Sequence, residues 1–257
     1  MGAENSTPEV DKEEGAADGA PGAAPVASAA SYEELSEKEA VDMIIKHTAS
    51  GEKTAGTMTT VEACCKRIRV LCRDQANCDA CDKVNASVAI VSAMDLYQEE
   101  PKVQLQALAA LVNLCSGEGS EHRQHAVEAD CLRRIVNAMK VHLKNSELQD
   151  MACIALQNCC YGEDENAVER RQKAAAAGAI ETTVQAMRAY PDLPVAQEVG
   201  IATLKLMVHK CADNKAMALA QGVPEEQLEP PSSKGKGGFL SFRTGFGTQR
   251  RKAKAAS

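Results

Sequence analysis

Apolar residues follow helical spacing through residues 36–223, and no segment of that span alternates apolar and polar residues as a half-buried strand does. Ser36 and Glu39 form a capping box, a pair of side chains that satisfies free backbone amides at a helix start. The helix that they begin ends at Gly51, and we expect Thr60 to cap the next helix. The pattern therefore predicts an all-helical body.

A segment of about 45 residues repeats along this body. The sequence IVSAM at 90–94 returns as IVNAM at 135–139 and as TVQAM at 183–187. Each copy precedes a longer apolar helix pattern, which ends at Cys115 in the first copy and at Cys160 in the second. Repeats of this length are typical of helical units that bury their apolar faces against neighbouring units.

The residue before each of these helices supports the same register. These residues are Asn85, Asp130, Gly178 and Gly222. They are spaced by 45, 48 and 44 positions, and Asn, Asp and Gly are the types that best tolerate a positive φ. A short helix that ends in a left-handed residue and turns into the next helix needs that tolerance. We therefore predict units of three helices, which span about 170–177, 180–189 and 195–208 in the third copy.

Two of these units carry a resemblance to a known family. The segment RRQKAAAAGAIETTVQAM, followed by VAQEVGIATLKLM, resembles an armadillo repeat. The segment HRQHAVEADCLRRIVNAM, followed by LQDMACIALQNCC, resembles a second one with Asp130 at the usual turn glycine. The resemblance covers about residues 61–223, as three repeats with part-units at both ends, and it implies a right-handed α-solenoid. HEAT repeats fit less well, because they lack the short first helix before the turn.

The armadillo resemblance implies a protein that binds an extended peptide, or a helical surface of a partner, along a concave groove of third helices. Peptide-binding members carry an asparagine ladder there, and Asn113 and Asn158 match that position. A primary amide suits this role because it can both donate to and accept from a peptide backbone. The expected groove residues are Asn113, Asn158, Gln104 and Gln149. The alternative for the asparagines is structural, since they could tie one helix to the next.

Two departures from the ladder pattern bear on the partner. Leu206 replaces the asparagine in the third copy. Ala109 and Ile154 replace the tryptophans that accompany the ladder in nuclear-import receptors. We therefore do not expect binding of nuclear-localisation signals. Separately, we expect a cytoplasmic protein, with a peripheral membrane location as the alternative and the nucleus less favoured.

Composition changes this picture mainly at the two ends of the chain. Aromatic residues make up 3% of the 257 residues, with no Trp, which favours helices packed on small side chains. Residues 1–39 hold ten acidic and two basic side chains, whereas residues 234–257 hold seven basic and no acidic ones. We expect a disordered acidic Ala/Gly-rich head over 1–35, a repeat domain over 36–223 and a disordered basic tail over 224–257.

Both ends have features of membrane association. Gly2 lies in a Met-Gly-x-x-x-Ser start, which fits the N-myristoylation pattern. All three Phe of the chain lie among the bases of the tail, where rings and cations suit an anionic membrane surface. The expected membrane contacts are Lys234, Lys236, Phe239, Phe242, Arg243, Phe246, Arg250, Arg251, Lys252 and Lys254. An acyl chain together with a basic patch binds membranes stably, whereas either alone binds weakly.

Other interpretations of the tail stay open. The helical spacing of its Phe residues would suit capture by a calmodulin-like protein, and QRRKAK would suit nuclear import. A third alternative is a solvated basic tail that binds nothing. Phosphorylation of Ser241 or Thr244 would reduce its positive charge. Because the first residues are acidic and Ala-rich rather than basic and apolar, we expect no secretion signal and an intracellular protein. A membrane-peripheral adaptor is the alternative to a scaffold, a Cys-based metal or redox protein is a further alternative, and no nucleic-acid partner is expected.

Few residues suggest reaction chemistry. Cys78-x-x-Cys81 suggests a zinc or redox site, but zinc needs a second pair or a histidine, and His122 lies far along the sequence. Most other cysteines fall at apolar helix positions, where Cys packs as a small hydrophobe. His122 and His125 are expected to be a polar surface pair. Motifs for nucleotide, dinucleotide and hydrolase chemistry are missing from the sequence, so we expect no enzyme activity, cofactor or metal.

Overall fold

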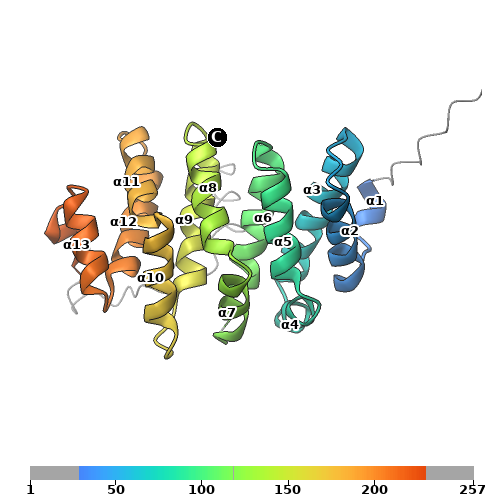
Figure 1. The fold of residues 1–257 in the computed structure, drawn as a ribbon, viewed down its shortest axis with the longest axis horizontal. Helices are drawn as coiled ribbons and strands as arrows, with labels where there is room; N and C mark the ends of the chain where they lie inside the picture. Colours follow the sequence, from blue (N-terminus) through green and yellow to red (C-terminus); the bar gives the residue numbers. More distant parts are fainter. Residues whose placement is uncertain (1–28, 118, 230–257) are drawn as a thin grey trace, which may run out of the picture.

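The computed structural model describes residues 29–117 and 119–229. Every regular element in these two stretches is an α-helix, which confirms the all-α prediction (Figure 1). The helices are α1 (Ala29–Tyr32), α2 (Glu37–Ser50), α3 (Ala55–Leu71), α4 (Gln75–Lys83), α5 (Ala86–Leu96), α6 (Pro101–Leu114), α7 (Glu121–Glu128), α8 (Cys131–Val141), α9 (Ser146–Cys160), α10 (Ala167–Ala177), α11 (Ala179–Ala189), α12 (Pro194–Val208), α13 (Ala212–Ala220) and α14 (Glu225–Leu228).

Helix α2 begins and ends as the sequence predicts. The Ser36 amide donates to the Glu39 carboxylate at 2.9 Å, and the Glu39 amide donates to the Ser36 hydroxyl at 3.4 Å. The two bonds make the predicted capping box. Gly51 follows the helix with a φ of 67°, the left-handed conformation that glycine adopts without steric cost.

The prediction that Thr60 caps the next helix is wrong. Thr54 caps α3, and Thr57 stands where a capping box usually has Glu or Gln. The Thr54 amide donates to the Thr57 hydroxyl at 3.0 Å, because a hydroxyl oxygen can accept this bond as a carboxylate does. Thr60 is buried in the second turn instead, with its Oγ1 2.9 Å from the Tyr32 Oη of α1.

Three successive helix triplets follow the predicted register. They are α4–α6, α7–α9 and α10–α12, and in the third triplet each helix lies within three residues of its expected bounds. The pair α2 and α3 precedes the first triplet, and α13 and α14 follow the last. The described chain therefore consists of three complete three-helix units with partial units at both ends.

The predicted turn residues all have a positive φ. The values are 61° at Asn85, 72° at Asp130, 98° at Gly178 and 80° at Gly222. Each left-handed residue ends a short helix and directs the chain into the next helix, α5, α8 or α11 in the complete units. Lys210 also has a positive φ of 58°, which the repeat pattern did not predict.

Two layers of helices result from this connectivity. The third helices α3, α6, α9 and α12 contact one another in chain order, and the second helices α2, α5, α8 and α11 do the same. Figure 1 shows the units side by side in one elongated row. Each complete unit thus packs on its neighbours along the chain, as expected of units that cannot bury their apolar faces alone.

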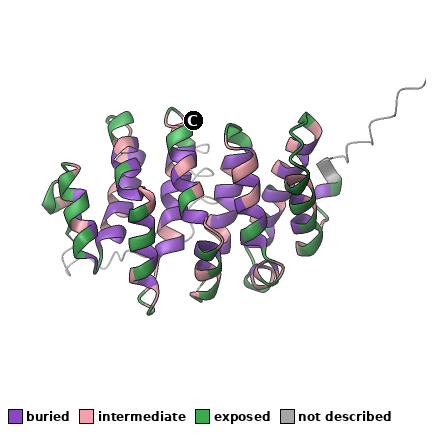
Figure 2. Cartoon of the chain, viewed as in Figure 1, coloured by how far each residue is buried: buried purple, intermediate pink, exposed green. Residues whose placement is uncertain are grey.

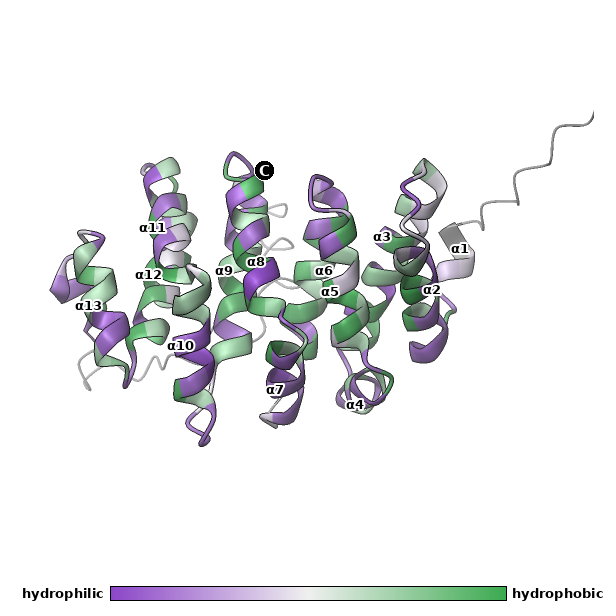
Figure 3. Cartoon of the chain, in the orientation of Figure 1, coloured by the Kyte–Doolittle hydropathy of each residue, from purple (hydrophilic) through white to green (hydrophobic). Residues whose placement is uncertain are grey.

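The interior is built from small and aliphatic side chains. All eleven Cys are buried, together with many Ala, Leu, Val and Ile, while Tyr32 and Tyr97 are the buried aromatic residues of the described part. Buried residues line the facing sides of the helices in Figure 2, and hydrophobic residues follow the same sides in Figure 3. Small side chains allow helices to approach one another closely, as the low aromatic content predicted.

The helical body extends past the expected bounds of 36–223. Tyr32 in α1 is 6% exposed, and Leu228 in α14 is 4% exposed, so both pack on the core. Residues 29–35 and 224–229 therefore belong to the packed body rather than to the head and tail in which the sequence placed them.

Buried arginines fasten the loops that follow the third helices. Arg123 donates to the Gly119 carbonyl at 2.7 Å. Arg170 makes two bonds to the Asp164 carboxylate, at 2.8 and 2.7 Å, and Arg171 donates to loop carbonyls on both sides. Because planar guanidinium groups offer several donors, Arg123 and Arg170 each satisfy groups of one loop, and Arg171 satisfies one carbonyl in each of two loops.

Candidate functional site

The candidate site is one side of the third helices, which we call the third-helix face. It is defined by residues of these helices, and just after α3, that stay half-buried or exposed: Lys66, Arg69, Val70, Arg73, Val112, Asn113, Gln157, Asn158 and Lys205. The helices α3, α6, α9 and α12 carry these residues or end just before them, and they contact one another in that order.

Asn113 and Asn158 repeat one geometry on this face. Asn113 Nδ2 donates to the carbonyl of Arg69 at 2.7 Å, and Asn158 Nδ2 donates to the carbonyl of Val112 at 2.7 Å. Each amide thus joins its third helix to the third helix of the preceding unit. This geometry matches the structural alternative for the two asparagines.

The same geometry leaves the Oδ1 acceptor of each amide unused by the described residues. Both residues are half-buried, and neither Oδ1 accepts a hydrogen bond from any residue that the structure describes. A fixed amide with a free acceptor can bind a backbone N–H of an extended chain. The bond to the preceding helix therefore holds the amide in place without excluding a role in binding.

Gln157 connects α9 to the third helix of the following unit. Its Nε2 donates to the Val199 carbonyl at 3.3 Å and to the Thr203 hydroxyl at 2.9 Å, both on α12. Helix α9 is therefore bound to α6 through Asn158 and to α12 through Gln157. Leu206, at the third ladder position, is 2% exposed and belongs to the core.

Gln104 and Gln149 are not on this face, which corrects the expectation that they line the groove. Both are 1% exposed. Gln104 Nε2 donates to the carbonyls of Met94 and Tyr97 at 2.9 and 2.8 Å, and Gln149 makes the equivalent pair of bonds in the next unit. The glutamines satisfy free carbonyls at the end of the second helix within their own unit, so a partner cannot reach them.

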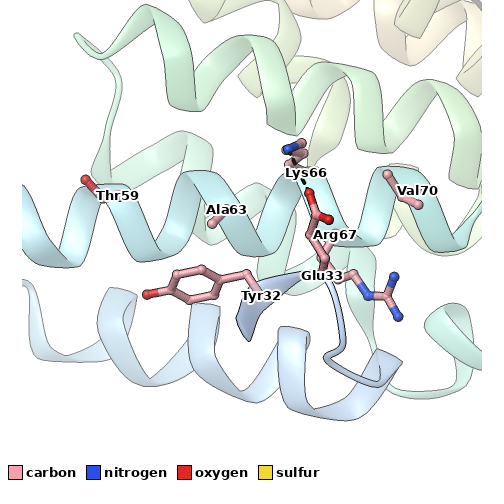
Figure 4. Close-up of a pocket in the computed structure, with 7 residues that line it drawn as sticks. All are labelled: Tyr32, Glu33, Thr59, Ala63, Lys66, Arg67 and Val70. Atoms are coloured by element: carbon pink, nitrogen blue, oxygen red, sulfur yellow. Dashed lines mark ion pairs between the residues drawn. The ribbon is translucent and has the colours of Figure 1, made fainter. Parts of the chain in front are cut away.

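A pocket of about 350 Å³ lies at the α3 end of the third-helix face (Figure 4). Helix α3 lines it with Thr59, Ala63, Lys66, Arg67 and Val70, and the other wall is formed by Tyr32 and Glu33. The Lys66 ammonium lies 3.5 Å from the Glu33 carboxylate across the pocket. The pocket combines an apolar floor with a charged rim, which suits an anchoring side chain of a bound segment.

A cluster of polar side chains between α4 and α7 was not predicted from the sequence. His122 Nδ1 lies 3.6 Å from Cys78 Sγ, and His122 Nε2 lies 3.2 Å from Asp79 Oδ1. His125 pairs with Asp82 at 2.8 Å. The expectation that His122 is far from Cys78 is therefore wrong. The two residues are 44 positions apart, which is about one repeat, and the period could have predicted their contact.

The cluster has no metal-binding geometry. Within residues 29–117 and 119–229, no group of three or more His, Cys, Asp or Glu side chains is arranged to hold a metal ion. The Cys72 thiol lowers the pKa of Cys78, although Cys78 is only 2% exposed. The His122 and His125 contacts instead join the first helices of neighbouring units, so the two histidines do more than form a polar surface pair.

Most other thiols are poor nucleophiles. Burial raises the pKa of Cys64, Cys153 and Cys160 to about 12. A thiol with this pKa is almost entirely protonated at neutral pH, and the thiolate is the reactive form. These cysteines serve as small core residues, as the sequence predicted.

The membrane-related predictions lie outside the described residues. Gly2 and the tail residues from Lys234 to Lys254 belong to the stretches 1–28 and 230–257. None of the described helices has the length and apolar character needed to cross a bilayer.

No protein-family model, curated protein or solved structure matches this chain.

Proposed function

We propose that this chain is a non-enzymatic protein-interaction scaffold, a right-handed α-solenoid of armadillo-type repeats. Its partner is an extended peptide segment, or a helical surface, that lies along the third-helix face as along a concave groove. The period of 45 to 48 residues, the three-helix units and the left-handed turn residue of each unit support this assignment.

The observation that carries the proposal is the matched pair Asn113 and Asn158. Two amides one repeat apart each donate one N–H to a carbonyl of the preceding third helix, and neither Oδ1 accepts a bond from a described residue. An extended peptide presents backbone N–H groups at regular intervals, so a periodic row of fixed acceptors suits it. Side chains of such a peptide would enter the spaces between successive third helices, including the pocket next to Val70.

A peptide selection tests this proposal. A random peptide library is selected against the immobilised full chain, and the affinity of the best synthetic peptide is measured by fluorescence anisotropy. We expect the double variant Asn113→Ala/Asn158→Ala to bind at least about tenfold more weakly, since each amide contributes on the order of 1 kcal/mol. Unchanged affinity, or no enriched peptide, would contradict the proposal.

The control for this experiment is Gln149→Ala. Gln149 lies on the same helix as Asn158 but is buried and bonded within its own unit. The variant should lose stability and keep its affinity for the peptide. A loss of affinity that follows stability in all variants would show that the asparagines act only through the fold.

We also propose a membrane-peripheral role for the two ends, with Gly2 acylated. One observation favours it: every Phe of the chain lies among seven basic residues in 234–257. Liposome co-sedimentation of the acylated full chain tests it, with Phe239→Ala/Phe242→Ala/Phe246→Ala as the variant. Binding should require anionic lipid and fall severalfold in the variant. Binding that is independent of both would contradict this role.

A further inference from the structure

Two arginines at the α3 end of the third-helix face have no acceptor among the residues that the structure describes. In the described part of the chain, Arg69 and Arg73 make no ion pair, and neither side chain donates to an oxygen that the structure describes. All other described arginines have such a partner: Arg67, Arg123, Arg133, Arg134, Arg170, Arg171 and Arg188. The third-helix face therefore ends in unneutralised positive charge.

Arg69 is also partly removed from water. Its Nε is buried without a hydrogen-bond partner, and burial, followed by the charge of Arg73, lowers the pKa of its guanidinium. A desolvated charge beside a like charge is unfavourable unless an anion neutralises it. The carboxylates closest in contact or in sequence do not do so, because Glu33 pairs with Lys66, and Asp74, next to Arg73, accepts the amides of Ala76 and Asn77. Among the described residues, this end of the face thus lacks an anionic ligand.

The chain itself supplies an acidic segment at this point. Helix α1 begins at Ala29, and Tyr32 and Glu33 line the pocket beside Lys66 and Val70. The described chain therefore begins within a few residues of the rim of the pocket, and residues 1–28 precede this point in the sequence. They hold six acidic side chains and one basic one. Twenty-eight residues can extend to roughly 90 Å, so length does not prevent them from reaching Arg69 and Arg73.

We propose that residues 1–28 dock on the third-helix face at Arg69 and Arg73 and cover Asn113, so that the acidic head competes with a bound partner. Asn113 is covered because its Nδ2 already contacts the Arg69 carbonyl. The docking depends on charge complementarity, and its effect on partner binding rests on the function proposed above. A tethered segment acts at an effective concentration on the order of millimolar, so even weak docking keeps this end occupied.

The test uses a labelled peptide with the sequence of residues 4–18 and full-length chains. In the head-neutralised chain, Glu9, Asp11, Glu13, Glu14 and Asp18 are replaced by Gln or Asn. This chain should bind the peptide at least about tenfold more tightly than the natural chain, whose own head occupies the site. Addition of Arg69→Gln/Arg73→Gln to the head-neutralised chain should remove the gain. Addition of Arg133→Gln/Lys140→Gln, which removes equal charge from α8, should keep it.

Three results would overturn the docking. They are equal affinity of the natural and head-neutralised chains, unchanged affinity after Arg69→Gln/Arg73→Gln, and no binding of the peptide to any chain. These results are obtained without a library peptide and without a change at Asn158, so they test the docking separately from the proposed function. Docking of the head without selection of any library peptide would refute the proposed function alone, and the reverse result would refute the docking alone.

Discussion

The third helices carry two sets of side-chain amides with opposite roles. Gln104, Gln149 and Gln197 lie near the helix starts, and each donates to two carbonyls of the second helix in its own unit. Asn113 and Asn158 lie near the helix ends, and each donates to one carbonyl of the preceding third helix. The first set closes a unit, and the second set joins units while keeping an acceptor free.

This difference shows that a repeated polar residue is not by itself evidence of a binding surface. Both sets recur with the period of the repeat, and both are amides. What separates them is the number of bonds that each amide donates within the fold, which is two for each glutamine and one for each asparagine. The glutamines have no donor left for a partner, whereas the asparagines have their acceptor left.

The largest expected effect is on the buried set. Gln149→Ala should lower the free energy of unfolding by about 2–4 kcal/mol, because two carbonyls lose their donor and a cavity forms. Urea denaturation measures this loss. The matched control is Gln157→Ala on the same helix, where a half-buried amide is removed and about 1 kcal/mol is expected. A smaller loss for Gln149→Ala than for Gln157→Ala would reverse the comparison.

A charged contact within a unit gives the next effect. Arg170 holds the pKa of the Asp164 carboxyl below its usual value. Ionised Asp164 therefore stabilises the fold above its unfolded pKa of about 3.9, and this contribution disappears as pH falls through the lower folded pKa. Asp164→Asn should cost about 2 kcal/mol near pH 7, since Arg170 is buried, and much less below about pH 3.

The pH dependence is checked by denaturation of natural chain and variant at both pH values. Asp192→Asn is the control, because Asp192 is exposed and makes no ion pair in the described part. A stability difference for Asp164→Asn that stays constant with pH would show that the carboxylate charge does not act through Arg170.

The smallest effect on stability is expected for the asparagines that join units. Asn158→Ala should cost about 1 kcal/mol, because a single bond to the Val112 carbonyl is lost. Its effect on peptide affinity should nevertheless exceed that of Gln149→Ala. Asn137→Ala, which removes an amide from the second helix α8, is the control and should leave affinity unchanged. A larger stability loss than for Gln149→Ala would contradict the division of roles.

The sequence predicts the helical units because their turns are local chemistry. Asn85, Asp130 and Gly178 are residue types that accept a positive φ, so the turn could be found without any long-range contact. The roles of Gln104 and Gln149 could not be found in this way, because their partners depend on how two helices of one unit pack.

Contacts between units could have been predicted from the period. Residues about one repeat apart meet repeatedly: the separations are 44 for Arg69 and Asn113, 46 for Val112 and Asn158, and 44 for Cys78 and His122. That Arg69 and Arg73 find no acceptor within 29–117 and 119–229 could not have been predicted, since it depends on which carboxylates fold close to α3.

The most direct test of the binding face is a hydrogen-exchange footprint of a selected peptide on the full chain. The peptide should slow hydrogen exchange along α6 and α9 near Asn113 and Asn158, and exchange in the second helices α5 and α8 should stay unchanged. Protection confined to α5 and α8 would contradict the assignment of the third-helix face as the binding surface.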